Sequence, residues 1–180
     1  MSKFAVLVLF VFCFVLCDTV SAQSSQAKTD ALVAALAKTK YKKKEKKNIS
    51  IEIYIDIKSE AVVKNDVREY AGVYEADSDY RLELSVSADG KVDGRGYDRR
   101  SNDSSKQNFT LKDARIEGAL LTATKVYENG ATENFEAVFN NRTVVTGKNP
   151  NQIESRETKY GLGFIQNYGD WTNRVFLELK

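Results

Sequence analysis

The stretch that decides the fold is residues 80–98, which read YRLELSVSADGKVDGRGYD. An apolar residue occupies every second position from Tyr80 to Val86, which is the period-two pattern of a half-buried strand. The Asp89-Gly90 pair then predicts a tight hairpin turn, because Gly90 can adopt the positive φ that such a turn requires. The second half of the segment returns as another strand, so the segment predicts two antiparallel neighbours.

The same succession of short strands and turn signals continues to the end of the chain. Asn129-Gly130 predicts another hairpin turn, Asn140-Asn141 predicts the next, and a loop is expected at residues 148–157 around the only proline. Sequential hairpins make antiparallel neighbours, and closing such a meander removes its exposed edges. We therefore predict a mainly β fold of about nine or ten strands, an antiparallel meander that forms a barrel or a strongly curled sheet. A two-sheet sandwich is the alternative.

The strongest single strand pattern lies before the meander, at residues 49–57. Isoleucine occupies every second position from Ile49 to Ile57, and polar residues or tyrosine occupy the positions between. One face of this strand would therefore carry five isoleucines. We expect that face to be buried, because a register slip of one residue would expose the whole row.

Residues 23–47 are expected to form a short helix that frays into a charged tail. Leu32, Val33 and Leu36 recur at helical spacing, but the apolar stripe is barely two turns long, so the helix needs a surface on which to dock. Lysines then crowd the next segment, against a single glutamate: Lys38, Lys40, Lys42, Lys43, Lys44, Lys46 and Lys47. This segment would either meet an anionic surface or serve as a solvated linker.

The first 22 residues have the pattern of a secretory signal peptide. Lys3 precedes an apolar run from Phe4 to Leu16, and Val20-Ser21-Ala22 fits the small-x-small cleavage pattern. The run is shorter than the ~20 residues of a membrane-spanning helix. An uncleaved anchor, or lipidation at Cys17, is the alternative. The predicted organisation is a signal peptide (1–22), a helix with a lysine-rich arm (23–47) and one β-rich domain (48–180), which is secreted or periplasmic and has no transmembrane segment.

The predicted mature chain lacks the side chains on which most catalytic and metal sites depend. The chain has no histidine, and both cysteines, Cys13 and Cys17, fall in the signal peptide. There is no Gly-x-Ser-x-Gly elbow, and carboxylate pairs such as Glu52 and Asp56 lie on the polar side of a strand, where solvation is the simpler interpretation. We predict no catalytic residue, no metal site and no cofactor, and we favour a protein that is not an enzyme.

The segment Tyr70-Ala71-Gly72-Val73-Tyr74-Glu75 opens the meander with a glycine flanked by aromatic residues, and Asp-Gly and Asn-Gly turns follow it. At the level of architecture, residues 70–180 resemble the lipocalin-like, or calycin-like, small barrels of exported bacterial proteins. The resemblance implies a small β-barrel and carries over no functional residues. Where the lipocalin signature has Gly-x-Trp, this chain has tyrosine, and its only tryptophan lies near the end.

Two functions of different classes follow from these patterns. In the first, an exported, non-enzymatic binding protein holds a small apolar or amphipathic ligand in the barrel. Inward-facing aromatic residues would line its site: Tyr54, Tyr74, Phe135, Phe164 and Trp171. In the second, a structural or interaction protein of the envelope or extracellular space binds an anionic surface through the lysines, or engages a protein partner, for example as an inhibitor. Nucleic acid is not expected, because the protein leaves the cytoplasm and only Tyr41 interleaves the lysines.

In a eukaryotic secretory pathway, Asn102 and Asn141, both in predicted loops, would be glycosylation sites.

Overall fold

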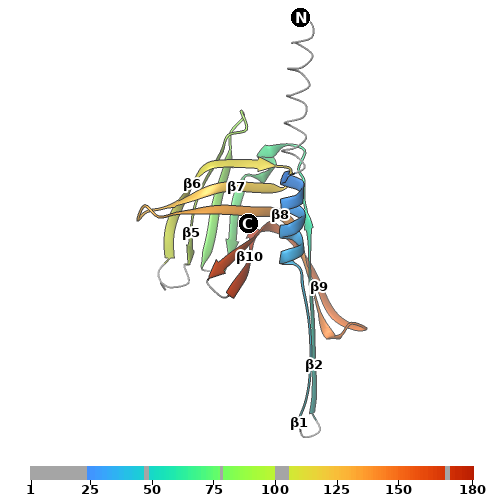
Figure 1. The fold of residues 1–180 in the computed structure, drawn as a ribbon. Helices are drawn as coiled ribbons and strands as arrows, with labels where there is room; N and C mark the ends of the chain where they lie inside the picture. The colour runs from blue at the N-terminus through green and yellow to red at the C-terminus, as the bar shows by residue number, and fades with distance from the viewer. Residues whose placement is uncertain (1–23, 47–48, 78, 100–105, 169–170) are drawn as a thin grey trace, which may run out of the picture.

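The computed structural model of this chain describes residues 24–46, 49–77, 79–99, 106–168 and 171–180. Within them, a helix at residues 24–36 leads into ten strands and one short 3-10 helix (Figure 1). The predicted signal peptide, Lys47 and Asn102 lie outside the described residues. The elements are β1 (Lys38–Lys46), β2 (Ile49–Ala61), η1 (Val67–Tyr70), β3 (Gly72–Ala76), β4 (Tyr80–Val86), β5 (Val92–Arg99), β6 (Lys106–Glu117), β7 (Leu120–Tyr127), β8 (Thr132–Asn149), β9 (Gln152–Tyr168) and β10 (Trp171–Leu179).

Strands β3 to β10 form a closed antiparallel barrel of eight strands. Each strand pairs with the next one in the chain, and β10 pairs back to β3 through Leu179 and Tyr74. The turns at Gly90 and Gly130 have φ values of 81° and 82°, as their Asp-Gly and Asn-Gly pairs predict. The predicted meander and barrel are confirmed, and the architecture agrees with that of lipocalin-like barrels.

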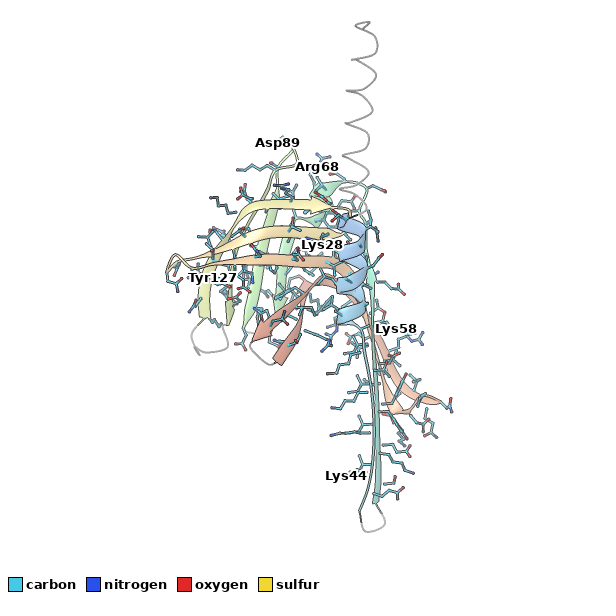
Figure 2. All side chains as sticks on the ribbon, viewed as in Figure 1. Lys28, Lys44, Lys58, Arg68, Asp89 and Tyr127 are labelled. Atoms are coloured by element: carbon cyan, nitrogen blue, oxygen red, sulfur yellow. The ribbon has the colours of Figure 1, made fainter. Side chains whose placement is uncertain are left out.

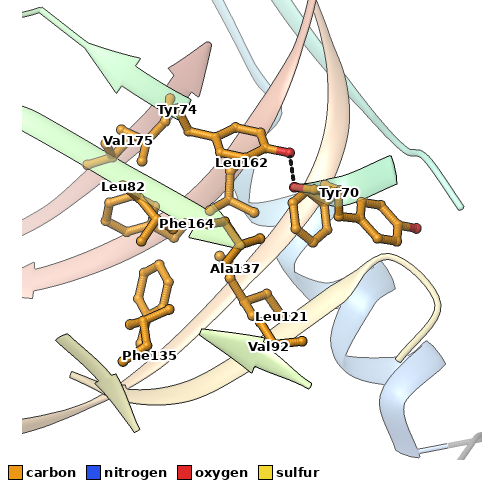
Figure 3. Close-up of a cluster of buried hydrophobic side chains, with 14 of the residues drawn as sticks. Tyr70, Tyr74, Leu82, Val92, Leu121, Phe135, Ala137, Leu162, Phe164 and Val175 are labelled. Atoms are coloured by element: carbon orange, nitrogen blue, oxygen red, sulfur yellow. Dashed lines mark hydrogen bonds between the residues drawn. The ribbon is translucent and has the colours of Figure 1, made fainter. Parts of the chain in front are cut away.

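The barrel interior is filled by apolar side chains that come from every wall (Figure 3). Tyr70 of η1 stacks on Phe139 with ring centroids 4.2 Å apart, and Tyr74 lies 5.8 Å from the same phenylalanine ring. The Tyr74 hydroxyl donates to the Tyr70 carbonyl at 2.7 Å, and the Tyr70 hydroxyl donates to the Gly118 carbonyl at 2.8 Å. Each of these buried hydroxyls thus has the partner that burial requires. An eight-stranded barrel is just wide enough for side chains to fill it or for one small ligand to bind inside.

Strands β8 and β9 are much longer than the sequence predicted. The expected turn at Asn140-Asn141 is wrong, because both residues lie inside β8 and pair with β2 on one side and β9 on the other. The Asn140 side chain is buried and donates from Nδ2 to Ser59 Oγ at 2.7 Å. Pairing at both edges thus overrides the turn preference of asparagine, so the expectation that Asn141 lies in a loop is wrong. The predicted loop at 148–157 is also wrong, since β9 already begins at Gln152.

Strands β1 and β2 form an antiparallel hairpin that projects away from the barrel (Figure 1). We call the part formed by residues 38–46 and 49–57 the arm. In the part of the chain that the structure describes, the barrel strand that pairs with β2 is β8, which pairs with β7 up to Val138 and with β2 from Asn140 onward. The expectation that the lysine-rich segment continues the helix as a frayed tail is wrong, because its partner strand β2 draws it into a sheet.

The helix at residues 24–36 docks on the outside of the barrel. Leu36 is buried against Ala119 and Val138, and Leu32 and Val33 are partly buried beside them. Lys28 forms an ion pair with Glu136 at 2.6 Å. The short apolar stripe therefore finds the surface that a marginal helix requires.

Candidate functional site

The two faces of the arm differ sharply in chemistry. Lys40 is paired with Ile55, Lys42 with Ile53 and Lys44 with Ile51, and cross-strand partners project to the same side of a sheet. One face therefore carries a row of lysines beside a row of isoleucines. We call it the Lys/Ile face, and it consists of Lys38, Lys40, Lys42, Lys44, Ile51, Ile53, Ile55 and Ile57.

The isoleucines at the outer part of the Lys/Ile face are exposed, which corrects the expectation of a buried row. The exposed fraction is 53% for Ile51 and 46% for Ile53, whereas Ile55 and Ile57 are half-buried nearer the barrel. The hairpin leaves the barrel before its tip, so the barrel does not cover the outer residues. The aliphatic stems of neighbouring lysines can shield such side chains only in part. Figure 2 shows the arm with Lys44 near its far end.

The opposite face of the arm is polar, and its carboxylates, Glu45, Glu52 and Asp56, outnumber its single lysine, Lys43. Lys43 Nζ lies 2.9 Å from Glu45 Oε1 and 3.7 Å from Glu52 Oε1, and the hydrogen bond with Glu45 raises the pKa of Lys43. Thr39 donates to Asp56 at 2.6 Å. Asp56 and Glu52 of β2 thus have a threonine and a lysine as partners within the polar face.

Positive charge consequently gathers on the Lys/Ile face. Among the described residues, no carboxylate forms an ion pair with Lys38, Lys40, Lys42 or Lys44. Alternate residues of a strand are about 7 Å apart, which is within the Debye length of about 8 Å at physiological salt. The lysines of β1 therefore repel one another, and a nearby anionic group would relieve that repulsion.

The structure distributes the seven predicted surface-binding lysines over different settings. Four of them form the row just described, and Lys43 lies on the polar face. Lys46 pairs with Ile49 in the register, so its position belongs to the same row at the far end of the arm. Lys47 lies outside the described residues. Sequence reasoning identified the charge, but it did not place this charge beside the isoleucines.

The five aromatic residues predicted to line a ligand site are only partly brought together. Tyr74, Phe135 and Phe164 are buried in the barrel core, and the rings of Phe135 and Phe164 are 5.2 Å apart in an edge-to-face contact. Tyr54 lies on the polar face of the arm, away from the barrel interior. The side chain of Trp171 lies outside the described residues.

The buried charge of Lys125 inside the barrel was not predicted from the sequence. Lys125 is 2% exposed, its Nζ lies 2.7 Å from Asp98 Oδ2, and the Nζ is also 4.4 Å from the centre of the Phe135 ring. The rings of Phe109 and Phe164 complete a cage around the ammonium group at 4.7 and 5.2 Å. A buried lysine is tolerated when it is paired and faces aromatic rings. Its signal was available, because Lys125 falls in phase with the inward-facing positions of β7.

Comparison with known proteins leaves the site to be argued from its own chemistry, since no family model, no curated protein and no solved structure matches this chain. Among the described residues, no cluster of three or more acidic, histidine or cysteine side chains could hold a metal ion. Within the same part of the chain, no helix is long and apolar enough to cross a membrane.

Proposed function

We propose that this protein is an exported interaction protein that binds an anionic, amphipathic surface through the Lys/Ile face of its arm. The observation that supports the proposal is the pairing of two rows on one face. One row has four lysines without described carboxylate partners, and in the other row Ile51 and Ile53 are about half exposed. The surface that complements both rows at once is a membrane that contains anionic lipids.

The lysine row would attract the arm to the anionic membrane, and the isoleucine row would insert into the lipid interface. A lysine close to an anionic membrane contributes about 1 kcal/mol, and the contribution falls off within a Debye length. A soluble polyanion would use only the charges and would leave the isoleucines in water. A lipid interface also takes up apolar side chains, at about 25 cal/mol for each Å² removed from water.

The barrel serves as the scaffold in this proposal. Its interior is packed with side chains such as Tyr70, Tyr74 and Phe139, all of which are at most 1% exposed. The alternative, in which the barrel holds a small apolar ligand, stays a prediction. The closely packed core favours the arm over the interior as the place where a partner binds.

The direct experiment is vesicle co-sedimentation of the protein purified after export. We expect binding to vesicles that contain phosphatidylglycerol, weaker binding at high salt, and little binding to pure phosphatidylcholine. Replacing Lys40, Lys42 and Lys44 by glutamine should weaken binding to the anionic vesicles by roughly 100-fold, since three lysines at about 1 kcal/mol each are removed.

A matched variant controls for net charge. Lys91, Lys106 and Lys112 are exposed on the barrel, and replacing all three by glutamine removes the same charge without touching the arm. We expect this variant to bind nearly as well as the unmodified protein. Equal losses in the two triple variants would refute a specific role for the arm, and so would equal binding to both kinds of vesicle.

A further inference from the structure

A hollow of about 240 Å³ lies on the outer face of the barrel where the arm begins. We call it the basal hollow. Its walls come from four parts of the chain: the end of the helix, the base of the arm, β8 and β10. The lining residues on which the argument depends are Leu36, Lys38, Ile57, Arg142, Arg174 and Phe176.

Two glycines of β9 leave space on the outer face of the barrel between β8 and β10. Gly161 pairs with Asn140 of β8, and Gly163 pairs with Phe176 of β10. A Cβ atom on Gly163 would lie 2.5 Å from Leu36 Cδ1, and one on Gly161 would lie 2.9 Å from Phe176 Cζ. The missing side chains therefore give Leu36 and Phe176 the space in which they form walls of the hollow.

The basal hollow contains cationic side chains and no carboxylate. Lys38, Arg142 and Arg174 line it, and none of them forms an ion pair with a described acidic residue. Arg174 donates from Nε to the carbonyl of Ala35 at 2.6 Å, which fixes its guanidinium group at the helix end. Arg142 lies over the Phe176 ring, 5.4 Å from its centre. Arginine in a fixed orientation is well suited to bidentate recognition of phosphate.

A second hollow on the same outer face has a different lining. It measures about 290 Å³ and shares Arg142 and Phe176 with the basal hollow. Four carboxylates line it, and Lys159 is neutralised there by Glu157 at 3.4 Å and by Glu178 at 2.8 Å. Of these two neighbouring hollows, only the basal one is lined by cations without any carboxylate among the described residues.

The basal hollow is also continuous with the Lys/Ile face. Lys38 and Ile57 are paired in the register, and they are the innermost members of the two rows. Ile57, Leu36 and Phe176 give the hollow apolar walls beside its cations. A ligand that bears a phosphate next to an apolar portion would meet complementary groups on both sides.

We propose that the basal hollow binds the phosphate-bearing headgroup of an anionic lipid, with Arg142 and Arg174 on the phosphate and Ile57 and Phe176 against the adjoining apolar part. This inference deepens the proposed function and rests on it for the choice of a lipid as ligand. The basal hollow would add a defined binding site for one lipid molecule to the Lys/Ile face, which otherwise recognises only charge and apolar surface.

The test uses dihexanoyl phosphatidylglycerol as a monomeric lipid, which presents no membrane surface, in isothermal titration calorimetry with the exported protein. We expect saturable binding that is tighter than that of inorganic phosphate and of dihexanoyl phosphatidylcholine. Arg142→Gln should weaken the binding about tenfold, as expected for loss of one charge-assisted contact. The matched control is Arg95→Gln, which removes an exposed arginine on β5 and should leave the affinity unchanged.

The outcomes separate this inference from the proposed function. The variant with Lys40, Lys42 and Lys44 replaced should lose vesicle binding and keep its affinity for the monomeric lipid, because the basal hollow is intact. Absence of saturable binding, equal losses in the Arg142 and Arg95 variants, or equal affinity for inorganic phosphate would each overturn the inference. If the unmodified protein binds the monomeric lipid and does not bind the anionic vesicles, the proposed function is overturned.

Discussion

The barrel and the arm are built from strands with the same period-two alternation, yet they use their apolar faces in opposite ways. In the barrel, Leu82 and Leu84 of β4 are buried among side chains from the other walls. In the arm, Ile51 and Ile53 are about half exposed. The difference teaches that alternation specifies a strand and its two faces, whereas the layer that covers a face is set by tertiary pairing.

The largest expected contrast between the two regions is in stability. Phe139→Ala would leave a cavity beside Tyr70 and Tyr74 and should lower the free energy of unfolding by about 4 kcal/mol. Ile53→Ala removes a partly exposed side chain and should change it by less than about 0.5 kcal/mol. Urea denaturation of both variants measures the contrast. A large loss in Ile53→Ala would mean that the arm is covered in solution and would break the comparison.

The buried ion pair gives the next largest effect. Asp98→Asn would leave Lys125 charged inside the barrel without the carboxylate charge that lies 2.7 Å from its Nζ, and should destabilise the protein by about 3 kcal/mol. Adding Lys125→Met to the same chain removes the unpaired charge and should restore most of the lost stability. If the double variant is as unstable as Asp98→Asn, the cost does not come from the uncompensated lysine.

The close approach of β9 and β10 predicts a smaller, graded effect. A Cβ atom on Gly161 would lie 2.0 Å from the backbone oxygen of Leu177, which cannot move without the strand. Gly161→Ala should therefore cost about 2 kcal/mol, whereas Gly163→Ala meets mainly the flexible end of Leu36 and should cost about 1 kcal/mol. Thermal denaturation orders the two variants, and the reverse order would contradict the packing described for the helix.

Alkaline pH should weaken the barrel through its buried tyrosines. Burial raises the pKa of Tyr74 and Tyr127 far above the usual value, and the charge of Asp98 adds to the effect at Tyr127. Above pH ~10 the unfolded chain loses these protons while the folded chain keeps them, so the free energy of unfolding falls by about 1.4 kcal/mol per pH unit for each tyrosine. Urea denaturation on both sides of that pH measures the slope. Tyr74→Phe should make it shallower, and an unchanged slope would contradict the assignment.

The barrel could be predicted from the sequence because each hairpin depends on local patterns. These are the alternation of apolar and polar residues along a strand and turn signals such as Asp89-Gly90. The prediction failed where strands are decided by distant neighbours. Asn140-Asn141 resembles a turn until β2 and β9 pair with it on both sides. The lysine-rich segment has the sequence of a solvated tail, but it forms a strand because it pairs with β2. The basal hollow joins Lys38, Arg142 and Arg174 from three separate segments, and no local pattern connects them.

The measurement that tests the central claim most directly is the polarity around single cysteines placed along β2 of the arm. The chain from residue 23 onward has no other cysteine. An environment-sensitive fluorophore would be attached at Ile51→Cys or Ile53→Cys on the Lys/Ile face, and at Ser50→Cys or Glu52→Cys on the polar face. On addition of phosphatidylglycerol vesicles, we predict a blue shift at positions 51 and 53 and little change at positions 50 and 52. Equal shifts at all four positions, or none at any, would contradict the account.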